Sequence, residues 1–247
     1  MACLDSFESD LEVCIIGASG GIGGAFLKAF NDESKVKKIY AFSRNNIDIT
    51  SNKILTYRID IEDEDSVIKA SELISTKKSI DIIIVATGIL HNLNISPEKN
   101  ISQTKSDSIK KVFSINAVGP LLIAKYFIPL LNPKRKSIFA VLSARVGSIK
   151  DNRLGGWTSY RTSKAALNML LKNISIEVKR KIPKCIISIL HPGTVNSELS
   201  KPYQKNVPEG SLFEADYAAR KLIKVIDNLN EDDSGLFYAW DGKLIDY

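Results

Sequence analysis

The stretch LEVCIIGASGGIG, residues 11–23, joins a short apolar run to a glycine-rich turn and to the start of a helical pattern. Glycine lets the chain turn tightly and lets backbone N–H groups approach a pyrophosphate. The N-terminus of the following helix adds about half a positive charge at the same point. The glycine spacing is Gly-x-x-x-Gly-x-Gly, and the alternative is a turn that only packs the helix against the strand. The place of the turn between strand and helix favours binding of a dinucleotide phosphate.

Apolar runs and helical patterns alternate from here to the end of the chain. The runs predict strands at residues 11–16, 38–42, 54–59, 81–86, 137–142, 185–190 and 236–239. The patterns predict helices at residues 21–30, 64–75, 107–131, 160–181 and 215–229, the third with a bend near Gly119-Pro120. Such alternation is typical of a parallel sheet with helices on both faces. We therefore predict an α/β protein, one domain over residues 1–247, with a Rossmann-like, doubly wound parallel sheet of about seven strands.

The composition is that of an ordinary globular protein, with 44% hydrophobic and 25% charged residues. The net charge of +6 comes from scattered lysines, whose short clusters at residues 132–136 and 179–184 lack interleaved aromatic side chains. A groove for single-stranded nucleic acid would have them. No apolar run reaches the ~18–20 residues of a membrane span, and the acidic residues 1–10 do not resemble a signal peptide. We expect neither a nucleic-acid partner nor a membrane partner.

Cysteine and histidine are scarce. Cys3, Cys14 and Cys185 have the spacing of neither a disulfide framework nor a metal site, and His91 and His191 are too few for a zinc site. We therefore predict no bound metal. Free cysteines within apolar runs indicate a reducing compartment, so the sequence predicts a cytoplasmic protein.

The end of the second predicted strand bears on the choice of cofactor. NAD-dependent enzymes usually place an acidic residue there to bond the adenosine ribose. This chain has Ser43 followed by Arg44, and an arginine can hold a 2′-phosphate with paired hydrogen bonds. The alternative is an exposed loop arginine. Asp60, after the third strand, can accept from the adenine amino group or can serve as a turn residue. We predict NADP(H) as the preferred cofactor, with NAD(H) possible.

Tyr160 and Lys164 stand four residues apart in a predicted helix, so both side chains can point into one site. A free tyrosine has a pKa near ~10, and a positive charge within ~4–6 Å favours the phenolate. Lowering that pKa by about three units needs roughly 4 kcal/mol, which Lys164 and a cationic nicotinamide ring could supply. Ser143 would then hydrogen-bond the substrate oxygen. By itself the Tyr–Lys spacing also fits a surface pair.

These motifs in this order resemble the short-chain dehydrogenase/reductase superfamily, over essentially the whole chain. The resemblance rests on residues 17–23, Asn116, Ser143, Tyr160 with Lys164, and Pro192-Gly193 after the sixth strand. Three segments are similar to the branch of the bacterial C-factor-like proteins and the sniffer-type carbonyl reductases: SARVGSI (143–149), DNRLGGW (151–157) and SGLFYAWDG (234–242).

The resemblance implies roles for the matching residues. Tyr160 would be the catalytic acid/base, and Lys164 would tune it and hold the nicotinamide ribose. Ser143 would orient the carbonyl. Asn116 would open a helix turn around a proton-relay water, unless it is a plain polar helix residue. The implied cofactor-binding residues are Gly17, Ser19, Gly20, Gly21, Ile22, Gly23, Ser43, Arg44, Asp60, Ile61, Ala86, Thr87, Gly88, Tyr160, Lys164, Pro192, Gly193, Thr194 and Val195.

The chain departs from the family pattern after the fourth strand, where Val85-Ala86-Thr87-Gly88 replaces the usual Asn-Asn-Ala-Gly. Residues 194–214 are rich in Pro, Ser and Lys and follow a strand end, where open α/β sheets bind ligands. We predict a mobile substrate loop there; the alternative is a fixed loop packed by Tyr203 and Phe213. The residues expected to border the substrate pocket, each of which could equally be structural, are His91, Arg145, Arg153, Trp157 and Tyr203.

We predict an NADP(H)-dependent oxidoreductase that acts on a small carbonyl or alcohol, with Tyr160 as acid/base. The alternative is a C-factor-like signalling or partner-binding protein that retains nucleotide binding with little catalysis. The predicted helices at 107–131 and 160–181 have apolar residues on more than one side. We therefore expect a homo-oligomer, dimer or tetramer, unless the C-terminal helix covers the surplus.

Overall fold

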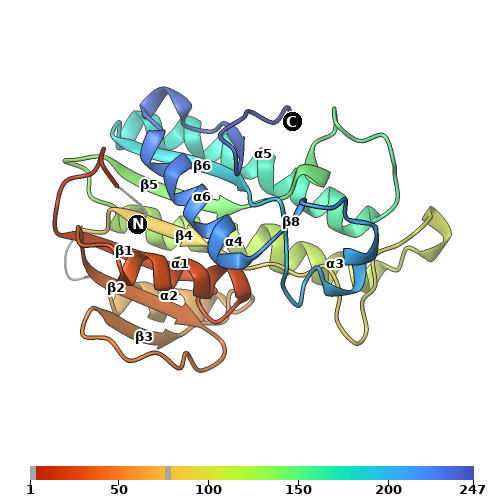
Figure 1. The fold of residues 1–247 in the computed structure, drawn as a ribbon, viewed down its shortest axis with the longest axis horizontal. Coiled ribbons are helices and arrows are strands. Elements are labelled where there is room, and N and C mark those ends of the chain that lie inside the picture. Colours follow the sequence, from red (N-terminus) through yellow and green to blue (C-terminus); the bar gives the residue numbers. More distant parts are fainter. Residues whose placement is uncertain (1–3, 76–78) are drawn as a thin grey trace.

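The computed structural model describes residues 4–75 and 79–247. Within these ranges, seven parallel strands form one sheet in the order β3-β2-β1-β4-β5-β6-β9 (Figure 1). The strands are β1 (Leu11–Ile16), β2 (Val36–Ser43), β3 (Ile54–Arg58), β4 (Ile82–Val85), β5 (Ser137–Leu142), β6 (Cys185–His191) and β9 (Phe237–Ala239). The predicted fold class is confirmed. The strand order reverses between β1 and β4, and open α/β sheets bind ligands at the carboxyl edge of such a switch point.

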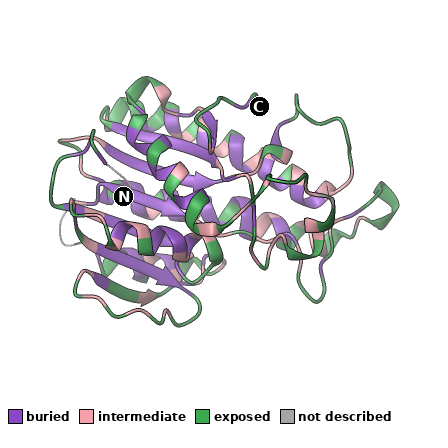
Figure 2. Ribbon diagram, viewed as in Figure 1, coloured by how far each residue is buried: buried purple, intermediate pink, exposed green. Residues whose placement is uncertain are grey.

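Helices cover both faces of the sheet. They are α1 (Gly21–Asn31), α2 (Glu64–Glu72), α3 (Ser106–Phe113), α4 (Gly119–Phe127), α5 (Thr158–Lys181) and α6 (Ala215–Asn228) among the described residues. α1 and α6 pack on one face, and α2, α4 and α5 pack on the other. Figure 1 shows α1 and α6 side by side in front of the strands, and Figure 2 shows buried residues concentrated in the sheet and on the helix sides that face it. Because α6 lies opposite α4 and α5, it does not cover their surplus apolar side chains.

The central strands formed where the sequence predicted them because their residues are buried on both faces, whereas the edge strand β3 is largely exposed. β4 reads Ile-Ile-Ile-Val, and all its residues are buried, as are those of β5. The ends of several elements differ from the prediction. β2 begins at Val36, α2 ends at Glu72, and α5 begins at Thr158.

The predicted helix over 107–131 consists of several segments. α3 passes into a π-helical turn, Ser114–Val118, which is followed by α4 and a short 3₁₀ turn, Ile128–Leu130. The irregularity expected near Gly119 is this π turn, in which the Gly119 N–H donates to the Ser114 carbonyl. By length and hydropathy Ser106–Leu130 could cross a membrane, which the sequence analysis did not anticipate. However, 56% of its most apolar window is buried inside the protein, so it is a core helix.

The segment after β6 contains structure that its sequence does not indicate. β7 (Thr194–Val195) pairs in parallel with β8 (Leu212–Phe213), and a 3₁₀ helix, Lys201–Asn206, lies between them. This small sheet closes both ends of the predicted substrate loop. Strands of two residues are too short to leave a hydrophobic period, which explains why the sequence showed no element here.

Candidate active site

The glycine turn brings the N-terminus of α1 close to the end of β1. Gly17 has φ of +91°, in the region that favours glycine. A Cβ at Gly23 would collide with the Gly17 carbonyl, so close packing of helix on strand requires glycine there. Gly20 caps α1 without a side-chain hydrogen bond. The helix end therefore presents backbone donors that no protein side chain occupies at the cap, a geometry suited to phosphate.

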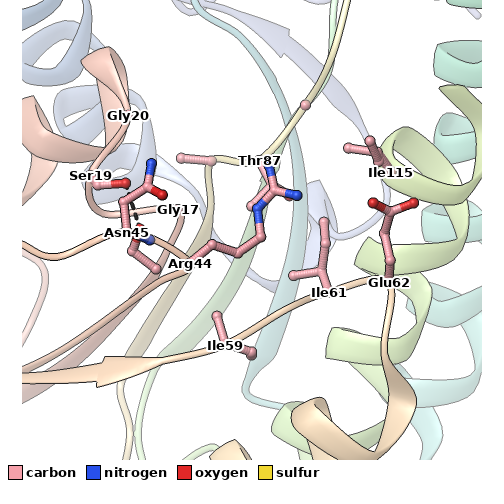
Figure 3. Close-up of a pocket in the computed structure, with 13 residues that line it drawn as sticks. Gly17, Ser19, Gly20, Arg44, Asn45, Ile59, Ile61, Glu62, Thr87 and Ile115 are labelled. Atoms are coloured by element: carbon pink, nitrogen blue, oxygen red, sulfur yellow. Dashed lines mark hydrogen bonds between the residues drawn. The ribbon is translucent and has the colours of Figure 1, made fainter. Parts of the chain in front are cut away.

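A pocket lies beside this turn, at the carboxyl ends of β1, β2 and β4 (Figure 3). Its lining comprises Gly17, Ser19, Gly20, Ser43, Arg44, Asn45, Ile59, Ile61, Glu62, Ala86, Thr87, Gly88 and Ile115. Nine of these are among the predicted cofactor residues. Asn45, Ile59, Glu62 and Ile115 were not predicted, because only the fold brings them to the pocket. The remaining predicted cofactor residues lie outside this lining: Gly21, Ile22 and Gly23 in α1, Asp60 after β3, Tyr160 and Lys164 in α5, and Pro192, Gly193, Thr194 and Val195 after β6.

The end of β2 forms a polar corner of the pocket. The hydroxyls of Ser19 and Ser43 hydrogen-bond each other, and the Asn45 N–H donates to Ser43 Oγ over 3.1 Å. The exposed Arg44 side chain extends across the pocket in Figure 3. Two hydroxyls and a guanidinium, with no carboxylate at position 43, make a corner that suits an anion.

Asp60 and Glu62 place carboxylates on the adjacent side. Asp60 Oδ1 accepts from the Glu62 N–H at 3.1 Å, so Asp60 serves as a turn residue, and its bond to the adenine amino group stays a prediction. Glu62 lines the pocket and forms a 2.7 Å ion pair with Lys111. The unusual Thr87 also lines the pocket, and its Oγ1 is buried without a hydrogen-bond partner among the described residues.

Contacts made by α5 connect the four predicted catalytic residues. Tyr160 and Lys164 lie one turn apart on α5, only 8% and 3% exposed. Lys164 Nζ donates to the Leu142 carbonyl at 2.9 Å, and Ser143 follows directly in the chain. A Cβ on Gly88 would lie 3.7 Å from Lys164 Nζ and 3.4 Å from Asn116 Oδ1. Both groups therefore lie close to the backbone at the end of β4.

Asn116 lies in the π turn and is wholly buried. Its Oδ1 accepts from the Ile89 N–H at 2.8 Å, and its Nδ2 donates to the Ile89 carbonyl at 2.9 Å and to Ser163 Oγ at 3.1 Å. These bonds fix the segment after β4 against the helix. The opened helix turn that the resemblance implied is present, while the anchoring of a water there stays a prediction.

Burial shifts the pKa values of the Tyr–Lys pair in opposite directions. It raises the pKa of Tyr160 to about 12 and lowers the pKa of Lys164 to about 8, because both charged forms lose water. The Lys164 ammonium is 6.0 Å from the centre of the Tyr160 ring. In the protein without cofactor, burial therefore dominates the tyrosine pKa, while the lowering expected from Lys164 together with a nicotinamide ring stays a prediction. Tyr160 is a protonated phenol at neutral pH.

Two buried residues that the sequence analysis did not single out support this site. Ser143 Oγ donates to Asn168 Oδ1 at 2.6 Å, and Asn168 lies one turn beyond Lys164 on α5. Glu98 is 4% exposed and accepts hydrogen bonds from the Ser159 N–H, at 3.1 Å, and from the Ser159 hydroxyl. Glu98 thus caps the start of α5 from 61 residues away. The i+4 spacing from Lys164 could have indicated Asn168, whereas no local signal indicates Glu98.

Aromatic rings extend from Tyr160 toward the predicted substrate loop. Trp157 lies edge-on to Tyr160, with ring centres 6.3 Å apart, and to Tyr203, at 5.1 Å. Tyr203 in turn contacts His91 at 5.7 Å, and His91 Nε2 is 3.0 Å from the Glu198 carbonyl oxygen. The structure thus brings three of the five expected pocket residues together.

Arg145 and Arg153, the other two expected pocket residues, make different contacts. Arg145 forms a 3.1 Å ion pair with Asp151, and both side chains are about half exposed. Arg153 is exposed, and its guanidinium donates to the Asn152 carbonyl at 3.3 Å. Neither takes part in the row of rings. Arg161, on α5, instead holds the segment directly before this helix by donating to the carbonyls of Gly155 and Gly156.

This arrangement has a counterpart in known proteins. The sequence profile of the family described as short chain dehydrogenase matches residues 12–208. The chain belongs to the short-chain dehydrogenase family. The 1-hydroxy-2-glutathionyl-2-methyl-3-butene dehydrogenase of Rhodococcus sp. (strain AD45) is 29% identical over 236 residues, which are 95% of this chain and 99% of that protein. The C-signal of Myxococcus xanthus is 33% identical over 133 residues, 53% of this chain and 74% of that protein.

Solved structures of the family share the fold along the whole chain. The carbonyl reductase Sniffer of D. melanogaster has a TM-score of 0.82 at 21% identity and covers 98% of this chain and 100% of its own. The NADPH-bound carbonyl reductase from chicken fatty liver has a TM-score of 0.80 at 24% identity, covering 97% and 100%. Together with the C-signal relative, these similarities confirm the resemblance to the C-factor-like and sniffer-type branch.

Proposed function

We propose that this short-chain dehydrogenase is an NADP(H)-dependent oxidoreductase that reduces a small carbonyl compound, or oxidises the corresponding alcohol, with Tyr160 as acid/base. One observation supports the proposal: Lys164 lies beside Tyr160 and donates to the Leu142 carbonyl next to Ser143, and both Lys164 Nζ and Asn116 Oδ1 lie close to Gly88, which lines the pocket at the glycine turn. A protein that bound nucleotide only for stability would not need this buried polar set, since burying polar groups costs stability.

The chain offers a fitting place for a dinucleotide. The glycine cradle would take the pyrophosphate at the N-terminus of α1. The buried, unpaired Thr87 Oγ1 gives the cofactor a hydrogen-bonding group at the end of β4. Ser43 and Arg44 would hold a 2′-phosphate. When bound, NADPH supplies a hydride from its nicotinamide ring to the carbonyl carbon.

The residues of the chain handle the proton and the substrate. Tyr160 is protonated at neutral pH because burial raises its pKa to about 12, so it can donate its proton to the carbonyl oxygen as the alcohol forms. Ser143 holds the same oxygen in place. Lys164 stays largely charged at pH 7, since its pKa is about 8, and its positive charge favours the phenolate that is left after proton transfer.

Substitution of Tyr160 tests the proposal. Tyr160→Phe keeps the ring packing against Trp157 but removes the proton, so NADPH-dependent turnover of a carbonyl panel should fall by ~10²–10⁴. Affinity for NADPH, measured by fluorescence, should barely change. Near-normal turnover would remove Tyr160 from the mechanism. No turnover by the starting protein, with NADPH binding intact, would favour the alternative of a C-factor-like partner-binding protein.

Substitution of Arg44 tests the cofactor preference. One charge-assisted hydrogen bond contributes about 1.5 kcal/mol or more, so NADPH should bind about tenfold or more tightly than NADH. Arg44→Ala should remove most of this preference. Arg180→Ala, an exposed change at the far end of α5, is the matched control and should preserve it. Equal affinities of the starting protein for the two cofactors would refute the assignment.

A further inference from the structure

Asn168 holds the hydroxyl of Ser143 from the side of α5. The donor–acceptor distance between Ser143 Oγ and Asn168 Oδ1 is 2.6 Å, and the two residues are 4% and 2% exposed. Tyr160, Lys164 and Asn168 occupy successive turns of α5, so they lie on neighbouring parts of one helix face. The same helix face thus supplies the phenol of Tyr160, the ammonium of Lys164 and, in Asn168, the hydrogen-bond partner of Ser143.

The helix around Asn168 also contains apolar core residues. Leu167 and Leu171, next to it on α5, are 1% exposed and belong to the hydrophobic core. A leucine at position 168 would therefore match its neighbours, whereas a buried amide is costly unless its polar atoms are used. Only one of the two ends of the Asn168 amide is used, because Nδ2 is buried without a partner among the residues that the structure describes.

Because Nδ2 has no partner, the Asn168 amide can also be placed in the opposite orientation, with Nδ2 toward Ser143. A serine hydroxyl has one proton and two lone pairs. With Asn168 Oδ1 beside it, the Ser143 hydroxyl donates its proton to the amide oxygen. It can then only accept hydrogen bonds from groups in the cleft. If the amide turns over, Nδ2 donates to Ser143 Oγ, and the serine proton becomes free for a carbonyl oxygen. The turned amide leaves an oxygen unpaired instead of an N–H, and buried N–H groups without partners are the rarer case.

We propose that Asn168 is a positioning residue of the active site, whose side-chain amide sets the direction of the Ser143 O–H bond. With the amide turned to donate, Ser143 directs its proton at the substrate oxygen beside Tyr160. This inference rests on the proposed reductase function. It adds to the Asn116, Ser143, Tyr160 and Lys164 set a residue that acts through Ser143 and does not itself touch the substrate.

The test is a double-mutant cycle on the full-length protein with NADPH and a carbonyl compound that the starting protein reduces. Asn168→Leu removes the amide at similar volume, and Asn168→Ala is a second variant. Each is made with Ser143 intact and in the Ser143→Ala background. Asn173→Leu, an exposed change on the same helix, is the matched control. The readouts are kcat, KM, the NADPH dissociation constant and the melting temperature.

We expect Asn168→Leu to lower kcat about tenfold, as for one lost hydrogen bond, with NADPH affinity unchanged. In the Ser143→Ala background the same change should lower kcat by less than about twofold, because the hydroxyl that Asn168 orients is absent. A purely structural role would give the same loss in both backgrounds. That result would overturn the inference, as would an unchanged kcat or the failure of both variants to fold.

The inference and the proposed function fail in different ways. If the starting protein binds NADPH but reduces no member of the carbonyl panel, the reductase function fails, and the role of Asn168 fails with it. If the starting protein is active and the two losses simply add, the reductase function stands and only the inference on Asn168 is wrong.

Discussion

Replacing Lys164 by methionine should stabilise the protein while abolishing its activity. Burial lowers the pKa of Lys164 from its ordinary 10.5 to about 8, which corresponds to about 3 kcal/mol at ~1.36 kcal/mol per pKa unit. The unfolded chain binds this proton more tightly, so the charged lysine destabilises the fold below pH 8, and the penalty vanishes as pH rises to 10.5. Methionine removes the penalty but leaves the Leu142 carbonyl without its 2.9 Å donor, at a cost of about 1 kcal/mol.

The net gain for Lys164→Met is therefore about 2 kcal/mol at pH 7 and about zero at pH 10, where the penalty has fallen to about 1 kcal/mol. Urea unfolding at the two pH values measures it. The ionisation of Tyr160, whose pKa is about 12, changes stability only above pH 10. It contributes equally to the free energy of unfolding of both proteins, so it cancels in the difference between them.

Lys179→Met, an exposed change on the same helix whose ion pair with Asp232 is at the surface, is the control and should stay within about 1 kcal/mol of the starting protein. A Lys164→Met protein that is no more stable at pH 7, or a gain independent of pH, would refute the argument.

Three further predictions follow from burial and packing. Burial and the positive charge of Arg145 lower the pKa of His191 to about 4. As the pH falls, His191 is protonated in the unfolded chain before it is protonated in the folded protein, so the free energy of unfolding should decrease between pH 6.5 and 4.5. His191→Gln should remove about 1–2 kcal/mol of this decrease, as measured by urea titrations. Residues 196–211, between β7 and β8, should exchange amide hydrogens quickly in the free protein and slowly with NADPH; equal, strong protection in both states would show a fixed loop. Exposed Met169 and Ile176 on α5 should lie in a two-fold interface, so light scattering should show a dimer or tetramer at micromolar concentration and Met169→Glu should yield monomer; a monomeric starting protein would contradict this.

The strands were predictable because their signal is local. β4, β5 and β6 are nearly continuous apolar runs, and burial on both faces of a parallel sheet requires such runs. The elements that the sequence missed depend on distant contacts. α5 begins at Thr158 because Glu98 caps it from the segment after β4. The π turn contains Asn116, whose side chain bonds the backbone of Ile89 in that same segment.

The candidate site was predictable in identity but not in environment. The spacing of Tyr160 and Lys164 and the place of the glycine turn follow from the sequence, since helix and strand periods fix them. The burial of the two side chains does not follow from the sequence, and burial decides the sign of the tyrosine pKa shift. Likewise, no local pattern shows that Thr87 Oγ1 or Asn168 Nδ2 is buried without a partner. Such facts depend on several elements packing together.

The buried face of α5 links these findings. Tyr160, Lys164 and Asn168 are almost fully covered, and burial costs stability at each of them. The same burial keeps the phenol protonated and brings the pKa of the ammonium close to neutral pH while leaving it largely charged, with pKa values of about 12 and about 8. A protonated phenol is an acid ready for carbonyl reduction, whereas alcohol oxidation needs a phenolate. The positive charge of an oxidised nicotinamide ring would favour that phenolate. Cofactor charge, acting on an acid that the fold holds protonated, would therefore set which direction of the reaction the site supports.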